Sequence, residues 1–387
     1  MRKPFLARRL DGFTSTIFAE MSALAIETGS INLGQGFPDV DGPALIRDAA
    51  KRAIDQGANQ YPPGPGIPEL RSAIGDHQRR FYGIDLDVDS EVLVTTGATE
   101  AISAAMLALL EPGDEVVVLE PYYDSYAATI SMAGGVRRPV TLRAPHFTLS
   151  HAEIAAAITG RTRLILLNTP HNPTGAVLSR EDLTHIADLA IAHDLLVVTD
   201  EVYEHMTFDD REHIPIATLP GMAERTLTIS SAGKTFSLTG WKIGWCTGPA
   251  ELVAAVRAAK QFLSYVSGSP FQPAIAQGLA MPDDFYRSVS AELQGKRDLL
   301  RSGLVEAGFE VNDCSGTYFL SVDARSVGYD DGTDLCRDLP KRCGVVAVPM
   351  SVFYDNQDEG RHLVRFAFCK KDDVLTEAAS RLATLRS

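Results

Sequence analysis

A lysine in a short turn of small residues is the most informative feature of the sequence. Lys234 lies in the segment Ser230-Ser231-Ala232-Gly233-Lys234-Thr235-Phe236, and a second cation, Lys242, follows eight positions later. A lysine amine can form an imine with a carbonyl cofactor. Small residues let backbone N–H groups and serine hydroxyls approach a phosphate, which Lys242 can neutralise. The segment predicts a site for a phosphorylated carbonyl cofactor, although a surface loop is the alternative from these residues alone.

Three further segments place polar residues directly after apolar runs. One run leads to Asn172, a second leads to Asp200 with Tyr203 three residues beyond, and a third leads to Gly97-Ala98-Thr99. Open α/β sheets bind ligands at the carboxyl ends of their strands. We therefore expect the amide of Asn172 and the hydroxyl of Tyr203 to reach a ligand, and the helix that starts at Gly97-Ala98-Thr99 to hold a phosphate. A plain Asn-Pro turn and ordinary helix N-caps are the alternatives.

These motifs resemble those of the class I aminotransferases, which are pyridoxal 5'-phosphate enzymes of fold type I. The resemblance runs almost from end to end, from Ala7-Arg8-Arg9-Leu10-Asp11-Gly12 to Leu363-Val364-Arg365-Phe366. The kynurenine aminotransferase and glutamine transaminase branch is the most similar part of the family. That likeness is carried by Asn32-Leu33-Gly34-Gln35-Gly36-Phe37-Pro38-Asp39, Asn59-Gln60-Tyr61, Ala232-Gly233-Lys234-Thr235-Phe236 and Thr317-Tyr318-Phe319-Leu320. Within the branch, Tyr61-Pro62-Pro63-Gly64-Pro65-Gly66 and Glu120-Pro121-Tyr122-Tyr123-Asp124-Ser125-Tyr126 resemble the bacterial N-succinyldiaminopimelate aminotransferases.

The resemblance implies a role for each residue of a pyridoxal 5'-phosphate site. Lys234 would carry the cofactor and shuttle a proton, and Asp200 would pair with the pyridine nitrogen. The phenolic oxygen would accept hydrogen bonds from Asn172 and Tyr203, and Tyr123 would stack on the ring. The phosphate would be held by Gly97, Ala98, Thr99, Ser231 and Lys242, together with Tyr61 from the partner subunit of a homodimer. Arginine is more usual at position 242, and lysine keeps its charge but lacks the bidentate fork.

Arg365 is the expected clamp for the α-carboxylate of the substrate. It lies in a strand-like run over 362–368, where a buried arginine requires an anion, and its planar guanidinium suits a carboxylate. From the residues alone, an internal salt bridge is the alternative. The resemblance also implies that Gly36 offers a backbone N–H to the same carboxylate. Phe18 stands where some kynurenine-using members carry tryptophan, and it is either a substrate contact or an ordinary core residue.

Composition argues against several other classes of protein. The chain has 387 residues, 45% hydrophobic and 22% charged, with a formal net charge of -14 at pH 7. It shows no basic stripe and no apolar run long enough to span a bilayer, so we expect neither a nucleic-acid nor a membrane partner. The basic residues at 1–9 lack an apolar signal core, and the 5 cysteines lack C-x-x-C spacing, which favours a cytoplasmic protein with free thiols. The 9 histidines form no metal-ligand motif, so no metal is expected.

Alternating apolar runs and helical patterns predict an α/β fold. Strands are expected at 92–95, 115–119, 163–168, 195–199 and 226–230, with helices at 98–110, 180–193 and 249–265. This alternation is typical of a mainly parallel sheet with helices on both faces. A long helix at 283–307 then leads to strands at 309–312, 318–322, 345–348 and 362–368 and a final helix to about residue 385. We expect an N-terminal arm over 1–42, a large domain over 43–282 and a smaller α+β domain over 283–387; the resemblance adds that the arm packs with the small domain.

The expected function is transfer of an amino group between an amino acid and 2-oxoglutarate or a similar keto acid. The resemblance favours N-succinyldiaminopimelate aminotransferase, an activity of lysine and diaminopimelate biosynthesis. A kynurenine, glutamine or methionine transaminase, with β-elimination of cysteine conjugates, is the alternative. A non-enzymatic regulator that retains the fold is an alternative of another class. A nicotinamide dehydrogenase is disfavoured because no strand leads into G-x-G-x-x-G.

Overall fold

A seven-stranded sheet forms the centre of the molecule, which a computed structural model describes over residues 5–13 and 17–386. The strand order is β2-β8-β7-β6-β5-β3-β4. Only the two pairs that involve β8 are antiparallel, which confirms the predicted mainly parallel sheet. The strands are β2 (Val92–Thr96), β3 (Glu115–Glu120), β4 (Val136–Thr141), β5 (Thr162–Asn168), β6 (Leu196–Asp200), β7 (Thr226–Ser231) and β8 (Ile243–Thr247).

Two of these strands, β4 and β8, were not predicted from the sequence. The edge strand β4 contains Arg137, Arg138 and Pro139, residues that blunt a sheet edge and weaken the local strand signal. Strand β8 contains Gly244, and glycine in a strand usually marks a close approach of another part of the backbone.

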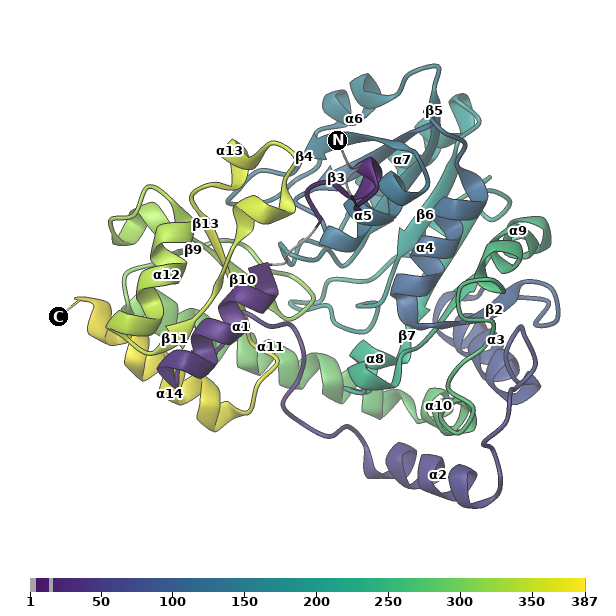
Figure 1. Ribbon diagram of the computed structural model, residues 1–387, viewed down its shortest axis with the longest axis horizontal. Coiled ribbons are helices and arrows are strands. Elements are labelled where there is room, and N and C mark those ends of the chain that lie inside the picture. Colours follow the sequence, from purple (N-terminus) through teal and green to yellow (C-terminus); the bar gives the residue numbers. More distant parts are fainter. Residues whose placement is uncertain (1–4, 14–16, 387) are drawn as a thin grey trace.

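Helices cover both faces of the central sheet, as Figure 1 shows. One face packs against α4 (Gly97–Leu109), α5 (Asp124–Met132) and α9 (Ala250–Lys260), and the other against α6 (His151–Ala157) and α7 (Arg180–Ala192). In β3, Val116 belongs to the first interface and Val117 to the second, because successive strand residues point to opposite faces. A sheet buried on both faces requires such continuous apolar strands.

A third helical group covers the end of the sheet at β2 and β8. It consists of α2 (Ala44–Asp55), α3 (Pro68–Tyr82) and α10 (Phe271–Leu279), which share an apolar core with Val94 and Trp245. A single turn of helix, α8 (Ala232–Thr235), follows β7 directly. Of the helices in residues 5–13 and 17–386, none combines the length and the apolar character that crossing a bilayer requires.

The C-terminal part contains a four-stranded antiparallel sheet with strand order β12-β13-β10-β9. Its strands are β9 (Glu310–Val311), β10 (Phe319–Asp323), β12 (Val348–Pro349) and β13 (Leu363–Ala367). The helices of this part are α11 (Asp283–Glu306), α12 (Gly332–Arg342), α13 (Gln357–Gly360) and α14 (Asp372–Ala383). The long helix and the strands expected at 309–312, 318–322 and 362–368 are therefore present, with ends shifted by a few residues.

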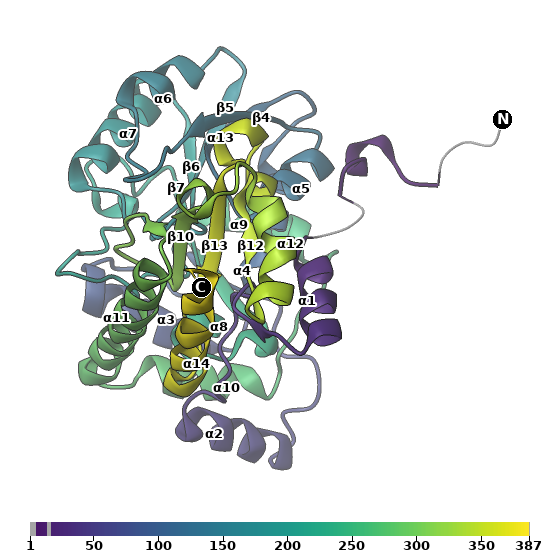
Figure 2. The ribbon, with the colours of Figure 1, turned by 90° about the vertical axis from the view of Figure 1, so that its left-hand side faces the viewer.

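The single strand predicted over 345–348 is wrong, because it is two short strands with different partners. β11 (Val345–Val346) pairs in parallel with β1 (Ile31–Asn32), whereas β12 pairs with β13. The first pairing joins the N-terminal segment to the C-terminal part. Figure 2 shows α1 (Ile17–Thr28) lying beside α12 on this side of the molecule.

The helix predicted over 249–265 is also wrong at its C-terminal end, since α9 stops at Lys260. The buried amine of Lys260 donates to the carbonyl oxygens of Gly64 and Tyr265, and Tyr265 adopts φ +62°. The chain then turns so that Ser267 lies 2.8 Å from the hydroxyl of Thr96 at the end of β2. Tertiary hydrogen bonds thus override the local helical pattern of this segment.

Candidate active site

A cavity of about 400 Å³ lies where the carboxyl ends of the central strands meet the C-terminal sheet. Almost every residue that the sequence singled out lines it. These are Phe18, Gly36, Gly97, Ala98, Thr99, Tyr123, Asn172, Asp200, Tyr203, Ser231, Lys234, Lys242 and Arg365. Strands β2, β5, β6 and β7 run in the same direction and end at this edge, which brings the segments that follow them together.

Lys234 lies on α8, immediately after β7. Its Nζ donates a hydrogen bond of 2.6 Å to the hydroxyl of Tyr318 and lies 5.6 Å from the ring centre of Tyr203. Burial lowers the pKa of Lys234 to about 8, although the thiol of Cys369 and the carboxylate of Asp200 act in the opposite direction. An amine with this pKa can exchange protons near neutrality.

Asp200 ends β6 as a fully buried carboxylate. Its Oδ2 accepts a hydrogen bond of 2.7 Å from the hydroxyl of Tyr126, and its Oδ1 accepts one of 3.3 Å from the N–H of Val202. Burial raises the pKa of Asp200 to about 6 in spite of these two donors. No helix begins at residues 201–205, so the N-cap alternative for Asp200 does not apply. The residue presents an anionic group to the cavity; Lys234 acts to lower its pKa, but no cation in residues 5–13 and 17–386 forms a salt bridge with it.

Asn168, which the sequence analysis did not select, joins the ends of two strands at the cavity. Its side-chain amide donates to the backbone carbonyl of Asp200 at 2.8 Å, and its Oδ1 accepts from the N–H of Asn172 at 2.7 Å. The contacts join the end of β6 to the loop that follows β5. A buried asparagine at the last position of an apolar strand was the available signal.

The start of α4 forms a seat suited to an anion. Gly97 adopts φ +70°, and the first N–H groups of a helix have no intrahelical partners. A Cβ added at Gly97 would lie 3.2 Å from the Nζ of Lys242, so this lysine extends over the same turn. A Cβ added at Gly244 of β8 would lie 2.5 Å from the carbonyl carbon of Gly97, so only glycine permits this approach. Ser231 completes the seat at the end of β7.

Arg365 lies on β13 with its guanidinium buried at the cavity. Nη1 donates to the Oδ1 of Asn172 at 3.0 Å and Nη2 donates to the carbonyl of Gly34 at 3.2 Å, while the buried Nε has no partner in the described part of the chain. Its Cζ lies 4.0 Å from the ring centre of Phe319. Burial lowers the pKa of Arg365 to about 10. Among the described residues it makes no ion pair, which argues against the internal salt bridge and for an external anion.

Gly36 and Phe18 complete the wall near Arg365. The carbonyl of Gly36 accepts a hydrogen bond of 2.6 Å from Tyr318, and a Cβ added at Gly36 would lie 2.5 Å from the ring of Phe319. The ring centre of Phe18 lies 5.4 Å from the Cζ of Arg365. Phe18 therefore contacts the cavity as well as the apolar core around it.

Tyr61 is the one selected residue that lies outside the cavity of its own chain. Its side chain is 81% exposed and meets Tyr265 edge to face, with ring centres 5.6 Å apart. The role predicted for Tyr61 involves the cavity of a second subunit, and it stays a prediction.

A buried polar cluster lies behind β7. Within the described ranges, ligand atoms of His77, Glu204 and His205 lie within 4.8 Å of one another, a grouping that the sequence spacing of the histidines did not reveal. The two imidazole Nε2 atoms are 2.7 Å apart, and Glu204 accepts from the hydroxyl of Ser230 at 2.6 Å. Burial lowers the pKa of both histidines. The contact with Ser230 ties the segment after Asp200 to the residue next to Ser231.

Comparison with known proteins agrees with this geometry. Residues 28–382 match the family described as aminotransferase class I and II. A probable N-succinyldiaminopimelate aminotransferase, DapC, of Mycobacterium tuberculosis is 54% identical, covering 97% of this chain and 98% of that protein. The methionine aminotransferase of Escherichia coli is 41% identical, covering 97% of both chains. The kynurenine–oxoglutarate transaminase of Dictyostelium discoideum is 38% identical, covering 98% of this chain and 96% of that protein.

Solved structures give the same result. The structure of N-succinyldiaminopimelate aminotransferase from Mycobacterium tuberculosis superposes with a TM-score of 0.95 at 55% identity. The superposition covers 98% of this chain and 100% of that one. Such similarity over the full length includes both the central sheet and the C-terminal sheet that enclose the cavity.

Proposed function

The chain belongs to the class I and II aminotransferase family and is an aminotransferase, and from this premise we propose that it moves an amino group between N-succinyldiaminopimelate and 2-oxoglutarate in diaminopimelate and lysine biosynthesis. The observation that carries the proposal is the 54% identity to the probable N-succinyldiaminopimelate aminotransferase over 97% of this chain, against 41% for the methionine aminotransferase.

Pyridoxal 5'-phosphate is the proposed cofactor, and the residues around the cavity fit it. The turn at Gly97 with Lys242 above it suits a phosphate, because it joins unpaired backbone N–H groups to a cation. The buried carboxylate of Asp200 makes no salt bridge among the described residues, and it suits a protonated ring nitrogen as a direct partner. Lys234 supplies a buried amine in the same cavity.

When bound, pyridoxal 5'-phosphate supplies an aldehyde for amino-group exchange and a ring that withdraws electrons. Lys234 would then have two tasks, to hold the group and to carry a proton on Nζ from the substrate's Cα to the carbon that was the cofactor's aldehyde. Its pKa of about 8 leaves a part of the amine neutral at physiological pH. The Oδ1 of Asn172 accepts from Arg365, which leaves its Nδ2 as a donor on the cavity wall. Tyr203 lines the same wall and would supply its hydroxyl as the second donor.

Arg365 binds the α-carboxylate in this proposal. Its Nε has no partner among the described residues, and two aromatic rings, those of Phe319 and Phe353, lie 4.0 and 4.9 Å from its Cζ and hold it in place. A buried guanidinium without an internal carboxylate gains strongly from an incoming one. The amino and keto substrates share this group, so one clamp serves both half-reactions.

The active unit is proposed to be a homodimer in which the exposed Tyr61 of each subunit reaches the phosphate seat of the other. The division into an arm over 1–42, a large domain over 43–282 and a small domain over 283–387 belongs to the same proposal. A cytoplasmic location is supported by the five cysteines, which are all buried and unpaired.

The alternative is a transaminase for methionine, glutamine or kynurenine. It is favoured by the cavity wall, where the described residues offer the rings of Phe18, Phe37 and Phe319 and no cation besides Lys234, Lys242 and Arg365. N-succinyldiaminopimelate carries further carboxylates, which need donors beyond Arg365. A substrate with an uncharged side chain needs no such donors.

A half-reaction screen separates the two candidates. Cofactor-loaded protein is mixed with N-succinyldiaminopimelate, methionine, glutamine, kynurenine and glutamate, and loss of the absorption of lysine-bound cofactor is followed by stopped flow. We expect N-succinyldiaminopimelate to react fastest per unit concentration. Faster conversion by methionine, glutamine or kynurenine would reject the leading substrate and favour the alternative.

Borohydride reduction tests the cofactor-carrying residue. Peptide mapping of the reduced protein is expected to find pyridoxal 5'-phosphate on Lys234, and Lys234→Ala should lose both the adduct and turnover. Lys242→Ala is the comparison, because it removes another lysine that lines the cavity; with saturating pyridoxal 5'-phosphate to offset the lost phosphate contact, the adduct on Lys234 should remain. An adduct on any other lysine would show that the assignment of Lys234 is wrong.

A further inference from the structure

Given the proposed role of Lys234, we propose that Tyr318 is a positioning residue that orients the Lys234 amine through two consecutive hydrogen bonds. The Nζ of Lys234 donates to the hydroxyl of Tyr318 at 2.6 Å, and that hydroxyl donates to the carbonyl of Gly36 at 2.6 Å. Tyr318 is fully buried behind the cavity. Its hydroxyl thus connects the amine to the segment proposed to contact the substrate carboxylate.

The single proton of the phenol determines what Tyr318 can do. Because that proton is directed to the carbonyl of Gly36, the phenol oxygen faces Lys234 with lone pairs alone. It can accept an N–H of the amine but cannot donate to the amine's lone pair. A neutral Lys234 held in this way keeps one N–H on Tyr318, so its lone pair points elsewhere, which leaves it available on the cavity side.

Tyr318 stays protonated throughout the working range of pH. Burial raises the pKa of Tyr318 well above its usual value, and the neighbouring Tyr203 and Cys369 act in the same direction. The hydroxyl therefore does not take up a proton from the substrate or from Lys234. A phenol that stays protonated can still accept a hydrogen bond from Lys234, and this contact orients Nζ.

A strained backbone conformation at Thr317 positions the hydroxyl of Tyr318. Thr317, a β-branched residue, adopts φ +67°, a conformation that residues with a side chain rarely occupy. The conformation is held by its N–H, which donates to the carbonyl of Met206 at 2.9 Å, and by an antiparallel bridge between Thr207 and Gly316. Strain of this kind persists where the surrounding structure requires a particular side-chain direction.

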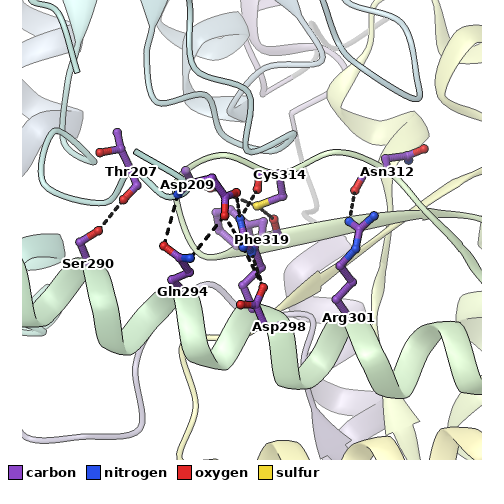
Figure 3. A network of polar contacts seen from close by, with 11 residues as sticks. Thr207, Asp209, Ser290, Gln294, Asp298, Arg301, Asn312, Cys314 and Phe319 are labelled. Carbon is purple, nitrogen blue, oxygen red and sulfur yellow. Dashed lines mark hydrogen bonds and ion pairs between the residues drawn. The ribbon is translucent and has the colours of Figure 1, made fainter. Parts of the chain in front are cut away.

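Helix α11 supports both segments that frame Tyr318. Figure 3 shows its side chains reaching the loop around Thr207 and Asp209 and the loop from Asn312 to Phe319. Arg301 donates to the carbonyl of Asn312 at 3.1 Å, and Arg297 donates to the carbonyl of Cys314 at 2.9 Å. The loop that leads to Tyr318 is thereby held by hydrogen bonds from α11.

The carbonyl of Gly36, which accepts from Tyr318, is also held in place by its surroundings. A Cβ at this position would lie 2.5 Å from the ring of Phe319 and 3.2 Å from the ring of Tyr318. Only glycine lets its carbonyl come within hydrogen-bond distance of the phenol. The direction of the amine and the position of the carboxylate-binding segment are therefore coupled through one hydroxyl.

Tyr318→Phe removes the hydroxyl and keeps the ring, so it isolates the effect of that hydroxyl on the Lys234 amine. An acceptor stabilises the charged amine, and its loss should make Lys234 easier to deprotonate by about tenfold. In cofactor-free protein, competitive labelling with acetic anhydride across pH, read by mass spectrometry of the Lys234 peptide, should show the midpoint falling by about one pH unit. Tyr286→Phe is the matched control, because Tyr286 is a buried tyrosine whose hydroxyl donates to the carbonyl of Leu279.

Steady-state kinetics of the loaded enzyme supply the second readout. With the amine free to rotate, kcat should fall by about tenfold or more while KM for the amino donor changes by less than about threefold, since Arg365 still holds the carboxylate. An unchanged labelling midpoint, an unchanged kcat, or an equal shift in Tyr286→Phe would overturn the proposal. Failure of the proposed function is seen separately, as a borohydride adduct on a lysine other than Lys234.

Discussion

Replacing Asp200 by asparagine should abolish activity and yet stabilise the cofactor-free protein. Asp200 is buried at the end of β6, and its hydrogen-bond donors are Tyr126 and the N–H of Val202. When no cofactor is bound, burial disfavours the charge of Asp200, and the attraction of the Lys234 amine offsets that penalty only in part. Asparagine has nearly the same shape and removes that charge, while its Oδ1 can still accept from Tyr126.

The size of the stabilisation follows from the pKa of Asp200. Burial raises it from an ordinary 3.8 to about 6. For an acid whose folded pKa is raised, ionisation penalises the folded state: the penalty is absent below pH 3.8, grows between pH 3.8 and 6, and is complete above. A difference of about 2 pKa units corresponds to about 3 kcal/mol at pH 7.5, and linkage reduces it to about 2 kcal/mol at pH 5.5. These values are upper limits, because the new amide must also find acceptors.

Urea unfolding of cofactor-free protein at pH 7.5 and pH 5.5 measures this difference. Asp200→Asn should unfold at higher urea than the parent protein at pH 7.5, and the gain should shrink by roughly 1 kcal/mol at pH 5.5. Tyr126→Phe is the companion variant with the opposite sign, because it removes a donor from the charged carboxylate and should destabilise the protein at pH 7.5.

Activity supplies the other half of the prediction. Turnover of cofactor-loaded Asp200→Asn should fall by orders of magnitude, because charge stabilisation of this kind is typically worth several kcal/mol. Addition of pyridoxal 5'-phosphate should also raise the melting temperature of the parent more than that of the variant. A variant that is less stable than the parent by the same amount at both pH values would refute the argument that the buried charge of Asp200 destabilises the folded, cofactor-free protein.

Two further substitutions test the neighbouring groups. Arg365→Lys should raise the apparent KM for both amino and keto substrates, on the order of 30-fold for a loss of about 2 kcal/mol in a charge-assisted pair, and unchanged KM values for all of them would return Arg365 to a purely structural role. Gly244→Ala places a Cβ 2.5 Å from the carbonyl carbon of Gly97, so it should lower stability by about 1–3 kcal/mol and weaken cofactor binding in equilibrium dialysis. Gly240→Ala is its control, because a Cβ there meets nothing within 4 Å, and equal losses in the two variants would contradict the steric argument.

Local patterns were sufficient to predict the class of fold and several cavity residues, and the family resemblance added others, among them Gly36 and Tyr123. Apolar runs that end in polar loops identify the carboxyl ends of parallel strands, and a doubly covered sheet brings those ends to one edge. For this reason Asn172, Asp200 and Lys234 could be selected before any contact was known, and all three line the cavity. The same local information predicted α7 and α11 to within a few residues.

Local patterns failed where long-range contacts decide the conformation. Helix α9 ends five residues before its helical pattern does, because Lys260 bonds to the carbonyls of Gly64 and Tyr265. The run 345–348 divides into two strands because its first part pairs with β1 and its last with β13. Neither partner is encoded in the run itself.

The sequence by itself determined which side chains are available to the cavity, and only the tertiary structure decided how they are held. Lys234 meets Tyr318 across 84 positions and Asn172 meets Arg365 across 193. Such pairs depend on the register of two sheets and on a strained residue, Thr317, whose φ of +67° no local propensity favours. The physical reason is that side-chain type follows from local chemistry, whereas orientation within a few tenths of an ångström follows from packing against segments that are distant in the chain.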